Sequence, residues 1–199
     1  MPLTAVNQTK NWADQLKGAI MDRTAAVCVI GLGYVGLPLA VEKAKVGFTV
    51  LGIDRNIARV GQVNRGLNYI GDVDGTELAE LVELKKLRAT DDFDALYYQD
   101  IVIICVPTPL TQFREPDISY IKNVVGEIAK RLRPGQLIIL ESTTYPGTTQ
   151  EVILPMLEAT GLRAGLDFFL AYSPERVDPG NKRYTTQNTS KVVGGVSVF

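Results

Sequence analysis

The feature that most constrains the fold is a series of short, unbroken apolar segments separated by segments with helical spacing. The apolar segments are rich in Val and Ile, which is typical of strands buried on both faces of a parallel sheet. We expect strands at Ala25–Ile30, Thr49–Ile53, Ile101–Val106, Gln136–Leu140, Phe168–Ala171 and Lys191–Val193. We expect helices at Gly36–Val46, Asn56–Arg65, Thr76–Lys85, Ile118–Arg131 and Thr148–Glu158. This alternation predicts an α/β fold, a doubly wound and mainly parallel sheet with helices on both faces.

The ends of the expected helices carry ordinary start and stop signals. Gly47, the pair Pro134–Gly135 and Gly161 follow helical segments, and Asp117 and Thr148 stand where a side chain can cap a helix N-terminus. These signals support the boundaries drawn from the apolar pattern.

Two parts of the chain are expected outside this alternation. Residues 1–24 form a leader in which Trp12, Leu16 and Ile20 have helical spacing, so we expect a short amphipathic helix lying on the main domain. Residues 25–199 are expected to form that domain. Within it, the stretch from Asp178 to Ser190 reads as a long polar loop.

Composition excludes several classes of function. The formal net charge of −1 provides no basic field for nucleic acid or an anionic membrane surface. There is no histidine, and the two cysteines, Cys28 and Cys105, each lie inside an apolar run, so we expect reduced thiols, no metal site and a cytoplasmic protein. No segment reads as a signal peptide or a membrane span.

A glycine motif follows the first expected strand. Gly31, Gly33 and Gly36 form the pattern G-x-G-x-x-G between an apolar strand and an amphipathic helix, the context that a Rossmann-type dinucleotide site requires. The first glycine permits a tight turn, the second lets backbone N–H groups approach a pyrophosphate, and the third lets the helix pack close to the strand. Asp54 ends the next strand about 20 residues further on, where a carboxylate binds the ribose hydroxyls. The pattern predicts a dinucleotide cofactor.

The acid at the ribose position favours NAD over NADP, because a carboxylate repels a 2′-phosphate. Arg55 is the competing signal, since a neighbouring arginine can accommodate that phosphate, stack on adenine or face solvent. We expect NAD.

Three later loops follow apolar strands, at the sheet edge where open α/β sheets bind ligands. They read CVPTPL from Cys105, ESTTYPGTT from Glu141 and YSPERVDPGN from Tyr172. Pro, Ser and Thr are common in any loop, but three such loops at one edge favour a site. Glu141 has a plainer interpretation, as a strand-end carboxylate paired with a basic neighbour.

These residues carry a family resemblance from about Ala25 to the end of the chain. In order and spacing, the sequence resembles the N-terminal domain of the UDP-glucose and UDP-N-acetylhexosamine 6-dehydrogenases, through the motifs GLGYVGLPLA, GIDRN, CVPTPL, ESTTYPGTT, SPERVDPGN and KVVGG. The SPERVDPGN segment is more similar to the UDP-N-acetylglucosamine or UDP-N-acetylmannosamine branch than to the UDP-glucose branch.

The resemblance implies an activity and a cofactor site. The activity is a twofold NAD-dependent oxidation of a sugar C6 hydroxymethyl group to a carboxylate, through an aldehyde held on an enzyme cysteine and then a thioester. On the cofactor side it implies that Asp54 binds the adenosine ribose, assisted by Arg59. The further cofactor residues are Gly31, Gly33, Tyr34, Val35, Gly36, Arg55, Thr108 and Thr143.

On the substrate side the resemblance implies that Glu175 helps water attack the thioester, with Thr108 as a second catalytic residue and Arg176 as a substrate contact. The UDP-glucose branch has a further glutamate where this chain has Pro179, so that role does not transfer. The family's central and C-terminal domains, with the nucleophilic cysteine, a lysine, an asparagine and most of the UDP contacts, are expected to be missing. We therefore expect an inactive cofactor-binding domain of an enzyme that is a homodimer at full length.

Two other functions remain open. A free-standing NAD-responsive regulator has no use for the SPERVDPGNKRY loop. A small hydroxyacid-type dehydrogenase needs an acid-base residue beside the nicotinamide, and Lys122 and Lys130 read instead as solvated residues on a helix surface.

Overall fold

The computed structural model describes residues 11–176 and 188–196. A seven-stranded sheet runs through its centre in the order β3-β2-β1-β4-β5-β6-β7. The strands are β1 (Ala26–Ile30), β2 (Thr49–Ile53), β3 (Leu87–Thr90), β4 (Ile101–Ile104), β5 (Leu137–Leu140), β6 (Phe169–Tyr172) and β7 (Gly194–Gly195). All neighbouring strands pair in parallel except β6 and β7. This order is that of a doubly wound Rossmann sheet.

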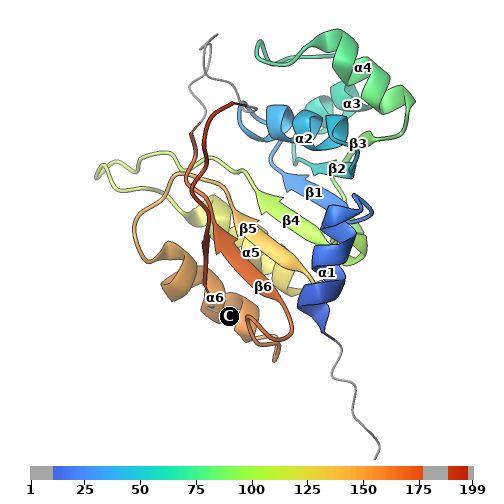
Figure 1. Cartoon of the computed structure of the whole chain (residues 1–199). Coiled ribbons are helices and arrows are strands. Elements are labelled where there is room, and N and C mark those ends of the chain that lie inside the picture. The colour runs from blue at the N-terminus through green and yellow to red at the C-terminus, as the bar shows by residue number, and fades with distance from the viewer. Residues whose placement is uncertain (1–10, 177–187, 197–199) are drawn as a thin grey trace, which may run out of the picture.

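Helices cover both faces of the sheet (Figure 1). They are α1 (Trp12–Met21), α2 (Gly36–Lys45), α3 (Ile57–Asn64), α4 (Gly75–Glu83), α5 (Ser119–Ala129) and α6 (Leu154–Glu158), with a 3₁₀ segment η1 (Phe93–Tyr98) and a π-helical segment η2 (Thr148–Ile153). Helices α1 to α4 contribute to one apolar cluster, and α5, α6, η1 and η2 contribute to the other. Within the described residues, no helix has the length and apolar character needed to cross a membrane.

Burial follows the alternation of side chains along each strand. In β1, Val27 and Val29 belong to the first cluster, while Cys28 and Ile30 belong to the second. Because both faces are covered, the strand is apolar at every position, which explains the unbroken runs in the sequence. The fold class expected from the sequence is therefore confirmed.

The leader contains a helix, α1, that packs on the first cluster through Leu16, Ala19 and Ile20. Asn11 caps it by accepting a hydrogen bond from the backbone N–H of Asp14 at 3.2 Å. Residues 1–10 of the expected leader lie outside the described part of the chain.

Some expected elements differ from the structure. The last strand lies at Gly194–Gly195 rather than at Lys191–Val193, and it is antiparallel. The strand β3 was not expected, because its sequence LRAT alternates polar and apolar residues at the sheet edge and lacks a continuous apolar run.

The helix expected from Thr148 begins as the π-helical segment η2. Thr148 does not cap it: Gly147 occupies the cap position, and the Thr148 hydroxyl donates to the carbonyl of Tyr145 at 2.9 Å. Asp117 is not the cap of α5 either: Ile118 occupies that position, and Asp117, one residue earlier, accepts a hydrogen bond from the Ser119 N–H at 2.9 Å. The polar loop expected from Asp178 to Ser190 lies largely outside the described residues.

Candidate functional site

The turn after β1 needs glycine at two positions for different reasons. Gly31 has φ of +94°, and a Cβ atom there would lie 2.4 Å from the carbonyl oxygen of Cys105. A Cβ at Gly36 would lie 1.8 Å from the carbonyl oxygen of Gly31. Any side chain at Gly36 would therefore push α2 away from the strand. The first and third glycines of the motif set the shape of the turn.

The second glycine faces open space. A Cβ at Gly33 would meet no atom within 4 Å, and the following Tyr34 side chain is exposed. The turn therefore leaves an open space directly before the N-terminus of α2, where free backbone N–H groups favour an anion.

Asp54, directly after β2, fixes the glycine turn through hydrogen bonds to its carboxylate. One carboxylate oxygen accepts the N–H of Leu32 at 2.8 Å, and the other accepts the N–H of Asn56 at 2.8 Å. The Arg59 guanidinium lies 3.5 Å from the first oxygen. A carboxylate offers about four acceptor positions, so Asp54 keeps capacity for ligand hydroxyls after fixing the turn. The sequence did not reveal this structural role.

Leu32 is held on its carbonyl side as well. The hydroxyl of Tyr69 donates to the Leu32 carbonyl oxygen at 2.8 Å. Burial, followed by the charge of Asp54, raises the pKa of Tyr69 to about 12, so the phenol is a neutral donor at ordinary pH. Tyr69 could not be named from the sequence, because nothing in the segment LNYI marks a contact with a turn 37 residues away.

A cavity of about 500 Å³ lies at the carboxyl ends of β1, β2, β4 and β5. It lies within the usual size range of small-molecule sites, and it includes the switch point between β1 and β4 where the strand order reverses. The residues named from the sequence that line it are Gly31, Gly33, Tyr34, Val35, Asp54, Arg55, Arg59, Thr108, Thr143 and Glu175. Gly36 and Arg176 are not among its lining residues.

Hydrogen bonds join the loops after β4 and β5. The Thr108 hydroxyl donates to the Thr143 carbonyl oxygen at 2.6 Å, and the Ser142 hydroxyl donates to the Val106 carbonyl oxygen at 3.0 Å. Two motifs that are distant in the sequence thus form one wall of the cavity. In the loop after β6, a Glu175 carboxylate oxygen accepts the N–H of Arg176 at 2.7 Å. Pro179 lies outside the described residues.

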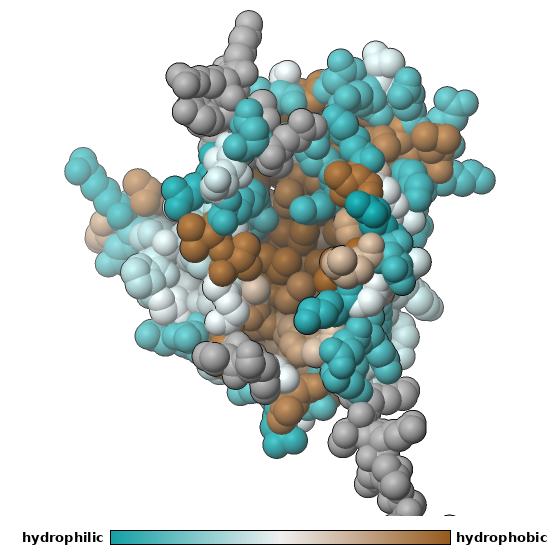
Figure 2. Space-filling view, in the orientation of Figure 1, coloured by the Kyte–Doolittle hydropathy of each residue, from teal (hydrophilic) through white to brown (hydrophobic). Residues whose placement is uncertain are grey.

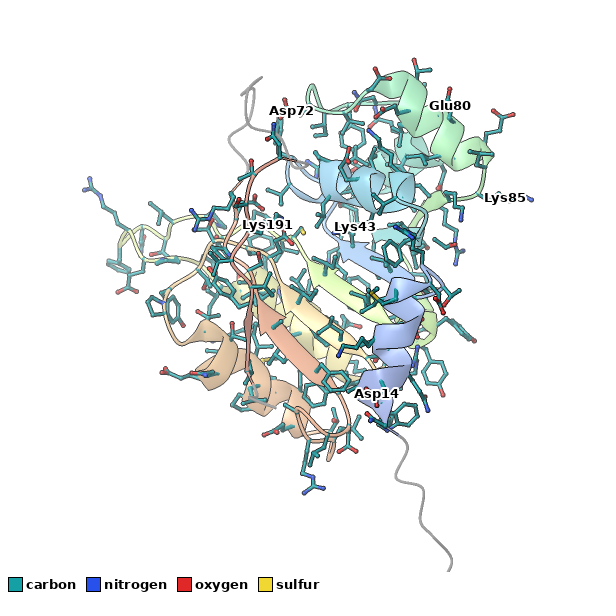
Figure 3. The ribbon with its side chains drawn as sticks, in the orientation of Figure 1. Asp14, Lys43, Asp72, Glu80, Lys85 and Lys191 are labelled. Carbon is teal, nitrogen blue, oxygen red and sulfur yellow. The ribbon has the colours of Figure 1, made fainter. Side chains whose placement is uncertain are left out.

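Glu141 directly follows β5 as a buried carboxylate and forms an ion pair with Lys191. Lys191 belongs to the C-terminal segment, which passes beside β6 (Figures 1 and 3). Burial lowers the pKa of the lysine. The plainer interpretation of Glu141, a partner for a basic group, fits this contact. Its basic partner was not evident from the sequence, because it follows 50 residues later.

Both cysteines are buried, and burial raises the pKa of each thiol. Cys28 lies inside β1, and Cys105 follows β4 on the cavity wall. A nucleophilic cysteine needs a lowered pKa and access to solvent, so neither thiol suits covalent catalysis.

These features fit a dinucleotide. The space at Gly33, the helix N-terminus beside it and the carboxylate of Asp54 match the pyrophosphate and ribose of a Rossmann ligand. The lining is mainly apolar, including Ile30, Ile53, Phe93 and Val106, as flat aromatic rings require.

Comparison with known proteins agrees with this geometry. Residues 25–198 match the model of the UDP-glucose/GDP-mannose dehydrogenase family, NAD binding domain. A UDP-N-acetyl-D-glucosamine 6-dehydrogenase of Pseudomonas aeruginosa is 42% identical over 170 residues, which are 85% of this chain and 39% of that protein. The chain thus spans about two fifths of the length of this relative.

Solved structures are similar over the same region. The UDP-D-ManNAc dehydrogenase of Pyrococcus horikoshii has a TM-score of 0.79 at 39% identity, covering 86% of this chain and 41% of that one. An NDP-N-acetyl-D-galactosaminuronic acid dehydrogenase of Methanosarcina mazei has a TM-score of 0.80 at 32% identity, covering 92% and 41%. The chain belongs to the UDP-glucose/GDP-mannose dehydrogenase family, and residues 25–198 are its NAD binding domain.

Proposed function

We propose that the chain is the NAD-binding part of a nucleotide sugar dehydrogenase that oxidises the C6 hydroxymethyl group of a UDP-N-acetylhexosamine. One observation carries the proposal: a single cavity joins the glycine turn and Asp54 to the loops of Thr108, Thr143 and Glu175. A regulatory module would need the first half of this cavity alone. The names of the relatives support the N-acetylhexosamine class.

On the adenosine side, we assign the ribose contact to Asp54, with Arg59 and Arg55 beside it on the cavity wall. The backbone of Gly33, Tyr34 and Val35 borders the open space before α2, where the pyrophosphate would gain from the helix N-terminus. Gly31 and Gly36 are assigned to the shape of the turn, and Gly31 also lines the cavity.

At the other end of the cavity, Thr108 and Thr143 would border the nicotinamide, and their hydrogen bond keeps the two loops together. NAD, when bound, supplies the acceptor of hydride in each of the two oxidation steps. Glu175 lines the same end of the cavity and is assigned to activating water, with Arg176 as a contact to the sugar nucleotide.

The covalent step is assigned to residues outside positions 1–199. Cys28 and Cys105 are buried thiols with raised pKa values, so the family's nucleophilic cysteine, and with it turnover, would come from further domains in a homodimeric enzyme. We place the active protein in the cytoplasm, where both thiols stay reduced.

Calorimetric titration tests the cofactor assignment directly. NAD should bind to residues 1–199 more tightly than NADP, because Asp54 repels a 2′-phosphate. Equal or tighter binding of NADP would contradict the role of Asp54 and favour Arg55.

The reaction is tested by NADH formation. Residues 1–199 alone should form no NADH with UDP-N-acetylglucosamine, since a substrate held by one loop loses most of the advantage of proximity. The same residues joined to the remaining domains of the Pseudomonas aeruginosa relative should restore turnover, faster with UDP-N-acetylglucosamine than with UDP-glucose. Steady NADH formation by residues 1–199 that survives Cys28→Ser and Cys105→Ser would contradict the proposal.

A further inference from the structure

Leu32, the residue between the first two glycines of the turn, is held from several directions. Its N–H donates to Asp54, its carbonyl accepts from Tyr69, and its side chain is fully buried. The Leu32 side chain packs so closely on β2 that a Cβ at Gly52 would lie 2.7 Å from it. The turn is therefore fixed by protein contacts alone.

The two hydrogen bonds orient the peptide groups on each side of Leu32. In a planar trans peptide the C=O and the next N–H point in opposite directions. Binding of the Leu32 carbonyl to Tyr69 therefore directs the Gly33 N–H away from Tyr69. Gly33 lines the cavity, whereas Tyr69 is not among the lining residues. Tyr69 thus orients the Gly33 N–H, which belongs to a cavity residue, without lining the cavity itself.

Tyr69 is itself held in place. The side-chain amide of Asn68 donates to the carbonyls of Ile70 and Val73 at 2.8 and 2.6 Å, and its oxygen accepts the Ile70 N–H at 2.8 Å. Ile70 and Val73 are buried in the first apolar cluster. The guanidinium of Arg59 lies 6.0 Å from the centre of the Tyr69 ring, on its face. The loop before α4 thus presents a fixed phenol to the turn.

We propose that Tyr69 is a positioning residue for the pyrophosphate of NAD, which it aligns through the carbonyl of Leu32 without touching the cofactor. Asp54 and Tyr69 then hold the same turn from its two sides. Asp54 also serves the ribose, but Tyr69 serves the turn alone. The inference rests on NAD binding in this cavity. Orientation of a donor before binding contributes to affinity because the ligand does not have to order it.

The variant Tyr69→Phe removes only the hydroxyl and is the direct test, with Tyr98→Phe as the matched control. Tyr98 lies on η1, is 75% exposed and is not among the cavity residues. Calorimetry should compare NAD, ADP-ribose and adenosine. Loss of one hydrogen bond should weaken NAD and ADP-ribose about 3- to 10-fold. Adenosine, which lacks the pyrophosphate, should bind to Tyr69→Phe as it does to the unaltered chain, and Tyr98→Phe should change none of the three.

The outcomes separate this inference from the assignment of the cofactor. Failure of the unaltered chain to bind NAD would overturn both. Normal NAD binding by Tyr69→Phe, or an equal loss for adenosine, would overturn the role of Tyr69 alone. Should Tyr69→Phe not fold, NMR of the unaltered chain without NAD decides: the Tyr69 hydroxyl proton, which donates to the Leu32 carbonyl, should be observable and slow to exchange. A hydroxyl proton that exchanges as fast as that of the exposed Tyr98 would refute the positioning role.

Discussion

Asp54 combines two roles at the scale of the residue, since it holds the Leu32 N–H and is assigned to the ribose. Replacement by alanine should weaken NAD binding by about 1–3 kcal/mol, as expected for hydrogen bonds to a charged group. Calorimetry measures the loss, and Asp91→Ala, an exposed carboxylate outside the cavity, is the control. Undiminished binding by Asp54→Ala would contradict the assignment of this carboxylate to the ribose.

Tyr69 should make the free energy of unfolding depend on pH in the alkaline range. Burial and the charge of Asp54 raise its pKa to about 12 in the folded chain, against an ordinary value of 10. Between these values the unfolded chain releases the phenolic proton first, so the free energy of unfolding falls as pH rises from 10 toward 12. Urea unfolding should show that the free energy of unfolding falls less between pH 9 and pH 11 for Tyr69→Phe than for the unaltered chain. An identical fall would mean that the phenol titrates normally in the folded state.

At the scale of the element, two glycines at the junction of β1 and α2 should have different roles, one in stability and one in NAD binding. Gly36→Ala places a Cβ 1.8 Å from the Gly31 carbonyl oxygen, so it should destabilise the fold by about 1–3 kcal/mol, as overpacking does. Gly33→Val meets open space, so it should leave the sheet intact yet abolish NAD binding, because the side chain occupies the place of the pyrophosphate.

Thermal unfolding and circular dichroism measure the first effect, and calorimetry with NAD measures the second. Each variant is the control of the other. Full NAD affinity in a folded Gly33→Val chain would mean that this loop is only a turn.

At the scale of the whole molecule, one face of the sheet is less covered than the other. Figure 2 shows brown side chains gathered in a hollow at the centre of the face that carries α1 and α2. On this face, three half-buried apolar residues of β5 and β6 pack against the first apolar cluster: Leu137, Ile139 and Phe169. Large apolar hollows on a protein surface mark interaction sites.

Residues 1–199 should therefore self-associate through this hollow as concentration rises. Ile139→Thr keeps a β-branched side chain but adds a hydroxyl, so it should shift the population toward the monomer in sedimentation velocity experiments. Leu166→Thr, at an exposed loop position, should leave the association unchanged. A chain that stays monomeric at high concentration would contradict this use of the hollow.

Local pattern was sufficient for the fold class of this protein. Unbroken apolar runs identify strands covered on both faces, and the glycine motif between β1 and α2 identifies the cofactor turn. The same motifs named residues that the structure brings together around one cavity, because the carboxyl ends of parallel strands meet at one edge of the sheet. The sequence alone thus determined the fold class, the class of ligand and the edge of the sheet where it binds.

Tertiary structure decided which partners these residues have. Tyr69 reaches Leu32, and Lys191 reaches Glu141, across separations that no local spacing records. The edge strand β3 forms because it pairs with β2 through backbone hydrogen bonds, although its own sequence is only half apolar. Such contacts arise when the packed sheet brings distant segments within hydrogen-bond range, so their selection depends on the three-dimensional arrangement rather than on the order of residues along the chain.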